Sequence, residues 1–144
     1  MARTNPETVV KKALIAFNRH DIDAYIATLD PNYVSGANEM LPNPPKGREA
    51  YRKVNEANFK AFPDCEFNVL NIAAKGGFVA AEVVFAGTFK GPWELPGRPP
   101  IPPTGRHFEV KMAMFARVNS KGLIAELRDY EDPAALLQQL GMKP

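Results

Sequence analysis

The sequence predicts an α+β domain in which helices pack against one curved, mostly antiparallel sheet. Apolar residues recur at helical spacing in the first 62 residues, where Asn5-Pro6 and Asp21 are typical helix starts. From Cys65 onward, alternating or continuous apolar stretches are separated by glycine-containing turns, as in antiparallel strands. This order of helices and strands favours the α+β class, and 144 residues suit one domain, residues 1–144, with room for one cavity.

Three helices and a short extended piece are expected first. Asn5 caps the first helix ahead of Pro6, Asp21 caps the second, and Asp30-Pro31-Asn32 ends it. Pro63 stops the third helix, which follows a proline-rich loop. The expected segments are residues 6–19, 22–29, 33–35 (extended) and 47–62.

Four longer strands and a final helix should follow. Lys75-Gly76-Gly77 joins the first two strands into a hairpin, and the six prolines between Gly91 and Gly105 make a stiff loop after it. Asp132-Pro133 starts the last helix, which Gly141 ends. The expected strands are Cys65–Ile72, Gly76–Phe89, Arg106–Val118 and Leu123–Glu131.

The second of these strands carries one ionisable side chain, Glu82, in an otherwise apolar stretch. A strand so apolar is expected to be covered on both faces, and a carboxylate within it requires a partner or a cavity. Burial would also raise its pKa towards the range in which proton-transfer catalysts work. Glu82 is therefore either a structural acid of the core or an acid of a pocket.

Composition excludes several classes of function. The net charge of +2 comes without a basic stripe, which disfavours nucleic acid and anionic membranes as partners. The single Cys65 excludes an internal disulfide, and the two histidines, His20 and His107, lie apart from any spaced acids, so no metal site is expected. No signal-like or membrane-spanning apolar run is found, which predicts a cytoplasmic protein.

Four short phrases in this order resemble the SnoaL-like polyketide cyclases and the related ester cyclases, a branch of the nuclear transport factor 2-like superfamily. They are Ala61-Phe62-Pro63-Asp64, Gly87-Thr88-Phe89-Lys90-Gly91-Pro92, Ile101-Pro102-Pro103-Thr104-Gly105-Arg106 and Leu136-Leu137-Gln138-Gln139-Leu140-Gly141. The likeness covers nearly the whole chain. It implies a cone in which the sheet wraps around three N-terminal helices and encloses an apolar pocket. It also implies a homodimer and no cofactor.

Asp129 is the leading catalytic candidate. Alternation along the last strand places Ala125, Leu127, Asp129 and Glu131 on one face, which suits an apolar pocket with an acid near its mouth. The resemblance implies that such an aspartate takes a proton from carbon beside a carbonyl group. Arg128-Asp129-Tyr130 also resembles the limonene epoxide hydrolases, but the arginine and second aspartate of that arrangement are missing. Asp129 could otherwise be an ordinary strand-end acid.

Further candidates are weaker. Glu82 could act with Asp129 as an acid and base pair, since two close carboxyls cannot both ionise easily. His107 could lie at a pocket rim, and Trp93 could fold over the mouth as a lid. The expected substrate-binding residues are Tyr25, Asn38, Glu39, Tyr51, Phe89, Trp93, Met114 and Leu127.

Three functions remain open on this basis. One is a cofactor-free enzyme that cyclises or isomerises a small, apolar, oxygen-bearing carbonyl compound. Another is a module that binds such a ligand without converting it, and the third is an epoxide hydrolase-like protein without the usual Arg/Asp pair.

Overall fold

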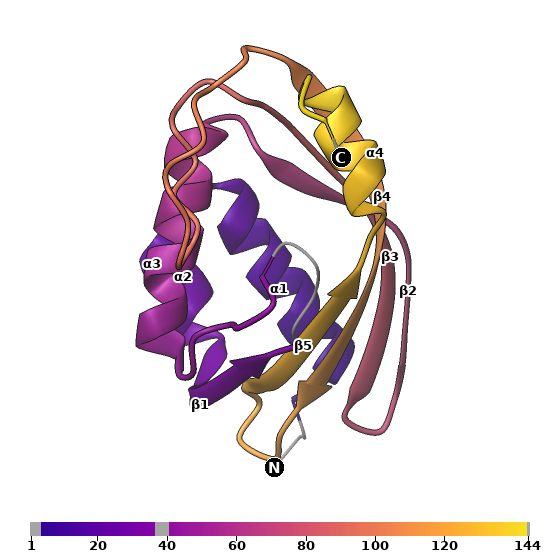
Figure 1. The fold of residues 1–144 in the computed structure, drawn as a ribbon. Coiled ribbons are helices and arrows are strands. Elements are labelled where there is room, and N and C mark those ends of the chain that lie inside the picture. Colours follow the sequence, from indigo (N-terminus) through magenta and orange to yellow (C-terminus); the bar gives the residue numbers. More distant parts are fainter. Residues whose placement is uncertain (1–3, 37–40, 144) are drawn as a thin grey trace.

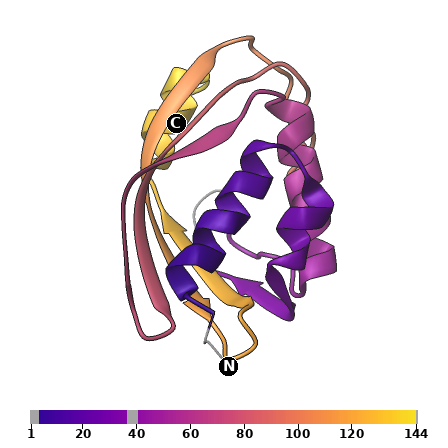
Figure 2. The same ribbon diagram turned by 180° about the vertical axis from the view of Figure 1, so that it is seen from behind.

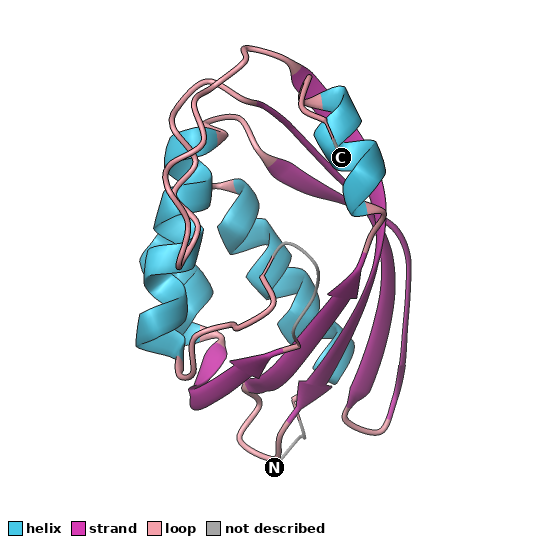
Figure 3. Ribbon diagram, viewed as in Figure 1, coloured by secondary structure: helices cyan, strands magenta, loops and turns pink. Residues whose placement is uncertain are grey.

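The computed structural model describes residues 4–36 and 41–143. Helices lie inside one curved five-stranded sheet, which confirms the predicted α+β class and the wrapped arrangement (Figures 1 and 3). The strand order is β1-β5-β4-β3-β2, in which β1 runs parallel to β5 and all other neighbours are antiparallel. The elements are α1 (Pro6–Asn18), α2 (Ile22–Ala27), β1 (Leu29–Ser35), α3 (Arg48–Ala61), β2 (Glu66–Lys75), β3 (Phe78–Thr88), β4 (His107–Val118), β5 (Ile124–Tyr130) and α4 (Pro133–Gln139).

The helix starts follow the predicted capping residues. Asn5 accepts a hydrogen bond from the Glu7 amide (3.0 Å), and Asp21 accepts one from the Ala24 amide (3.1 Å). Asp132 does the same for Ala134 at the start of α4 (3.0 Å). Seen from behind, α1 crosses the concave side of the sheet, so its apolar face meets the strands (Figure 2).

The second helix is shorter than predicted. It ends at Ala27, and Leu29, expected on its apolar face, is the fully buried first residue of β1. The amide of Ile124 donates to the carbonyl of Thr28 (2.8 Å), and Leu29 pairs with Ile124. Leu29 and Ile124 are 95 residues apart in the sequence. This long-range strand pairing, and not the local helical spacing of apolar residues, determines the structure at Leu29.

The prediction that both faces of β3 are covered is wrong. Val79, Ala81 and Val83 are buried against the helices, whereas Phe78 and Glu82 are exposed on the other face. The helices cover only the concave side of the sheet, so every second residue of β3 points outward, whatever its polarity. Glu82 therefore lies on the outer face, where it accepts a hydrogen bond from Asn71 (2.9 Å).

Strand β5 contains a bulge that alters the predicted faces. Its register with β4 slips between Ile124 and Glu126, so Ala125 has no partner opposite it. As a result Ile124 and Leu127 are both buried, although strict alternation assigned them to opposite faces. From Leu127 to Asp129 every second side chain again points into the cavity.

The proline-rich segment between β3 and β4 is a narrow hairpin, which we call the proline hairpin (residues 89–106). Trp93 and Ile101 exchange two backbone hydrogen bonds across it (2.9 and 3.0 Å). At its base the amides of Lys90 and Gly91 both donate to the carbonyl of Ala61 at the end of α3. The hairpin thus folds back along α3 (Figure 1).

No helix in residues 4–36 and 41–143 is long and apolar enough to cross a lipid bilayer. The core side chains pack between the helices and the concave face of the sheet. Phe62 is central to this core, because its ring contacts those of Phe89, Trp93 and Phe108 at centroid distances of 5.1–5.4 Å.

Candidate functional site

A cavity of about 140 Å³ lies between the helices and the concave face of the sheet. All the helices and strands named above and the proline hairpin contribute to its wall, which is mostly apolar. Aromatic rings dominate the apolar part: Phe17, Phe62, Phe67, Phe85, Trp93 and Phe108. Such a wall favours a flat, apolar ligand.

Two carboxyl groups reach the cavity from one side. Asp129, near the end of β5, lies opposite Met114 of β4, and both residues line the cavity. Glu131 follows two residues later and also lines it. Both acids are half-buried, so each carboxyl borders the apolar wall and remains in reach of solvent.

Three tyrosines line the same cavity as these acids. Tyr25 (α2), Tyr33 (β1) and Tyr51 (α3) all line the wall, and burial raises the pKa of each phenol above its usual value. The negative charge of Asp129 raises the pKa of all three further. The phenols therefore stay protonated near neutral pH and are hydrogen-bond donors; the Tyr51 hydroxyl donates to that of Ser35 (3.1 Å).

Two asparagines of α3 complete the polar groups of the wall. Asn58 accepts a hydrogen bond from the indole nitrogen of Trp93 (3.0 Å), which fixes the proline hairpin to α3. Asn55 is buried and donates to the backbone carbonyl of Tyr51 (3.0 Å). Among the residues that line the described cavity, none is an arginine or a lysine. The wall thus offers acids and neutral donors but no cation.

Six of the predicted site residues line this cavity. They are Tyr25, Tyr51, Trp93, Met114, Leu127 and Asp129. Asn38 and Glu39 lie outside the residues that the structure describes. Glu82, His107 and Phe89 do not line the cavity.

Glu82 points away from the cavity because it occupies an outward position of β3. It therefore does not share the cavity with Asp129, so the condition under which the two could act as an acid and base pair is not met. Phe89 is fully buried, but its ring packs against those of Phe62 and Trp93, behind the cavity wall. It supports Trp93 and does not line the cavity.

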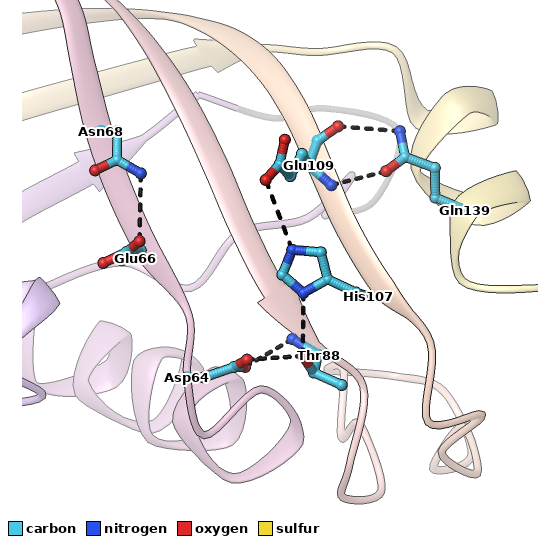
Figure 4. A network of polar contacts seen from close by, with 7 residues as sticks. All are labelled: Asp64, Glu66, Asn68, Thr88, His107, Glu109 and Gln139. Carbon is cyan, nitrogen blue, oxygen red and sulfur yellow. Dashed lines mark hydrogen bonds and ion pairs between the residues drawn. The ribbon is translucent and has the colours of Figure 1, made fainter.

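His107 belongs to an exposed network on the sheet (Figure 4). The Thr88 hydroxyl donates to Asp64 (2.7 Å) and lies 3.1 Å from Nδ1 of His107, and Nε2 lies 3.7 Å from the carboxylate of Glu109. Gln139 of α4 bonds the backbone of Glu109 in both directions. The expectation that His107 lies at the pocket rim is wrong, because the first residue of β4 starts on the outward side.

The sequence did carry signals for the site residues that were missed. Asn55 and Asn58 are polar residues on the otherwise apolar side of α3 that carries Val54 and Phe62. Tyr33 lies in the short extended piece that was expected, but nothing in the sequence shows that β1 joins the sheet beside β5.

Within the described part of the chain, no group of three or more His, Cys, Asp and Glu side chains is arranged to hold a metal ion.

Comparisons with known proteins agree with this architecture. Residues 8–140 match the sequence profile of the SnoaL-like polyketide cyclases. Among solved structures, IdmH from Streptomyces antibioticus, a candidate polyketide cyclase, is 31% identical, with a TM-score of 0.75 and coverage of 96% of this chain and 100% of that one. AclR from Streptomyces galilaeus, a candidate hydroxylase, is 26% identical, with a TM-score of 0.76 and coverage of 96% and 97%.

A third structure bears on the fold alone. A Catenulispora acidiphila protein with a ketosteroid isomerase-like fold, crystallised with trimethylamine, is 21% identical, with a TM-score of 0.76 and coverage of 96% and 95%. A search of curated proteins found no match. The profile match spans nearly the whole chain and the wrapped α+β fold recurs in these structures. The chain therefore belongs to the SnoaL-like polyketide cyclase family.

Proposed function

We propose that this protein is a cofactor-free enzyme that cyclises or isomerises a small, apolar carbonyl compound, with Asp129 as its general base and acid. The observation that carries the proposal is the position of Asp129. Its carboxyl lies at the wall of an apolar cavity, and its charge raises the pKa of three buried phenols that line the same cavity. An acid in such surroundings is a typical proton-transfer group.

The chemistry begins with a C–H bond beside the substrate carbonyl. Its proton passes to the Asp129 carboxylate, and its electron pair moves into a C=C bond, so that the carbonyl oxygen becomes an enolate. In an isomerisation, Asp129 returns the proton to another carbon. In an aldol-type ring closure, the enolate carbon bonds to a second carbonyl carbon, whose oxygen then takes the proton from Asp129. Either route leaves the enzyme unchanged.

The epoxide hydrolase alternative has less support. That arrangement requires an arginine beside the acid, and no arginine lines the described cavity. The neighbouring strand β4 presents Met112 and Met114 there instead. Binding without conversion remains the second candidate, because the aromatic wall alone suffices to hold an apolar ligand.

We also propose that the chain forms a homodimer through the outer face of its sheet. Phe78, Phe115 and Tyr130 form a row across β3, β4 and β5 on this face, with centroid distances of 5.8 Å between neighbours. Tyr130 is 57% exposed and Leu70 of β2 is 48% exposed. Sedimentation velocity should give twice the chain mass, and Phe115→Glu should give the monomer; a monomeric wild type contradicts the proposal.

Deuterium exchange tests the enzymatic proposal. 2-Tetralone is a small apolar ketone whose exchange of C1 protons in D2O is followed by NMR. The wild type should accelerate this exchange, and Asp129→Asn should reduce the acceleration by about 10²–10⁴-fold. Glu82→Gln is the matched control, because it removes an acid from the outer face, and it should exchange as fast as the wild type.

The alternatives give different results. Equal exchange rates for the wild type and Asp129→Asn contradict the role of Asp129. Binding of 2-tetralone without any accelerated exchange would support the binding module instead.

A further inference from the structure

Tyr33 has a buried hydroxyl group that has no hydrogen-bond partner among the residues that the structure describes. The residue is fully buried in β1, and no described side chain or backbone group bonds its hydroxyl. Among the described residues it is the only buried side-chain oxygen or nitrogen in this condition. Buried tyrosines normally pair their hydroxyl groups, since an unpaired donor loses its hydration without compensation. The exception therefore requires an explanation.

The neighbouring hydroxyl groups are already engaged. Tyr51 donates to the Ser35 hydroxyl (3.1 Å), and Ser35 in turn donates to the carbonyl of Gly36 (3.3 Å). The Tyr51 ring packs edge-on against the Tyr33 ring at 5.1 Å, which holds the latter in place. Tyr33 is thus held in position by the Tyr51 ring, while the Tyr51 hydroxyl bonds Ser35 and not Tyr33.

The surroundings of Tyr33 favour a donor rather than an anion. Burial, the phenols of Tyr25 and Tyr51, and the charge of Asp129 hold the pKa of Tyr33 well above its usual value, and the Ser35 hydroxyl opposes them only in part. Tyr33 therefore keeps its proton while Asp129 is charged. Its ring lines the same cavity wall as Asp129. A polar group of a ligand in this cavity can supply an acceptor for this buried donor.

We propose that the Tyr33 hydroxyl binds the reacting carbonyl oxygen of the substrate and stabilises the negative charge that develops on it. This inference rests on the proposed function, because it concerns the oxygen whose neighbouring carbon loses a proton to Asp129. As that C–H bond breaks, its electron pair shifts towards the oxygen, and the hydrogen bond from Tyr33 strengthens. A donor already positioned for this charge lowers the barrier without rearranging during the step.

The assignment also defines the ligand class. The substrate should carry a carbonyl or enol oxygen on a flat apolar frame, with the proton that is removed on the adjacent carbon. 2-Naphthol has this shape and serves as a stable analogue of the enol of 2-tetralone. Naphthalene has the same frame without the oxygen. The ratio of the two dissociation constants isolates the contribution of the oxygen.

Calorimetry with the two compounds tests the proposal. The wild type should bind 2-naphthol more tightly than naphthalene, and Tyr33→Phe should reduce that ratio about fivefold to tenfold, as expected for the loss of one hydrogen bond. Naphthalene affinity should not change. Tyr130→Phe, which removes an exposed hydroxyl from the outer face, is the matched control and should keep the wild-type ratio.

Thermal unfolding separates a ligand donor from a structural hydroxyl. Tyr33→Phe removes a group that bonds nothing within the described chain, so its melting temperature should equal or exceed that of the wild type. Tyr51→Phe removes the bond to Ser35 and should melt at a lower temperature. A lower melting temperature for Tyr33→Phe, with an unchanged ratio of affinities, would overturn the proposal, and so would a cavity that binds neither compound.

The exchange assay distinguishes this inference from the proposed function. If both hold, Tyr33→Phe slows the exchange of 2-tetralone on the order of a hundredfold. If Asp129→Asn exchanges as fast as the wild type while Tyr33→Phe still weakens 2-naphthol binding, the proposed function fails and Tyr33 remains a ligand donor. If Asp129→Asn is slow while Tyr33→Phe matches the wild type in both assays, only the assignment of Tyr33 fails.

Discussion

The indole nitrogen of Trp93 donates a hydrogen bond to the side-chain oxygen of Asn58 at 3.0 Å, and both residues line the cavity. This bond joins the proline hairpin to α3, which are separated by β2 and β3 in the chain. Trp93 is only 6% exposed, so the hairpin already covers this side of the cavity. Whether Trp93 moves as a lid remains a prediction.

Asn58→Leu should destabilise the protein by about 1–3 kcal/mol, because it leaves the buried indole N–H without an acceptor. Urea unfolding followed by the emission of Trp93, the single tryptophan of the chain, measures this change. Asn68→Leu replaces an exposed asparagine of β2 and should change stability by less than about 0.5 kcal/mol. Equal losses in the two variants would show that the bond to Trp93 contributes nothing.

Phe62→Ala should destabilise the fold by about 3–5 kcal/mol. Phe62 is 2% exposed and contacts three aromatic rings, so removal of its ring leaves a cavity that its neighbours cannot fill. Phe62→Leu, which keeps most of the volume, should cost clearly less. Chemical denaturation of both variants checks the order, and a Phe62→Ala protein as stable as Phe62→Leu would contradict it.

Asp64 should contribute to a decrease in the free energy of unfolding when the pH is lowered. Burial raises its pKa, but hydrogen bonds from the Thr88 hydroxyl and amide (2.7 and 2.6 Å) outweigh this and hold the pKa below its usual value. A carboxyl with a lowered pKa stabilises the fold above its unfolded pKa, and this contribution disappears as the pH falls through the folded pKa. Unfolding free energies at pH 7 and pH 3 should therefore differ less in Asp64→Asn than in the wild type.

Thr88→Val supplies the companion test, since it removes the hydroxyl donor and keeps the amide. Its stability should depend on pH less than that of the wild type but more than that of Asp64→Asn. Thr104→Val alters an exposed threonine of the proline hairpin and should keep the wild-type dependence. A Thr88→Val protein with the wild-type dependence would exclude the hydroxyl as a cause.

Cys65 should resist thiol reagents in the folded protein. It is 1% exposed, and burial, with the charge of Asp64, raises the pKa of its thiol to about 12. At pH 8 little thiolate forms and the sulfur is covered, so iodoacetamide should label the native chain far more slowly than the chain in concentrated urea. Mass spectrometry measures the labelled fraction; equal rates in the two states would contradict the buried position.

Much of the fold was predictable because it depends on local chemistry. Asn5, Asp21 and Asp132 cap helices where the sequence predicted caps, and the Lys75–Gly77 turn joins the predicted hairpin. The bounds of the short strand β1 were harder to predict. Leu29 belongs to it only because β5 lies alongside, and that neighbour is distant in sequence.

The site was predictable where position within a strand determined the face. Met114, Leu127 and Asp129 line the cavity as predicted. The sequence left Glu82 open between a structural acid and a pocket acid, because an apolar composition does not show which face of β3 the helices cover. Ile124 was misplaced because the bulge at Ala125 leaves no mark in the sequence pattern. Tyr33 required the pairing of β1 with β5 to be known.

The dependence of the 2-tetralone exchange rate on pH tests the central claim most directly. In the wild type the rate should rise with pH as one carboxyl ionises and then level off. In Asp129→Asn that rise should disappear and the rate should fall by about 10²–10⁴-fold. A mutant that keeps both the rate and the pH profile of the wild type would contradict the role of Asp129 as the base of this cavity.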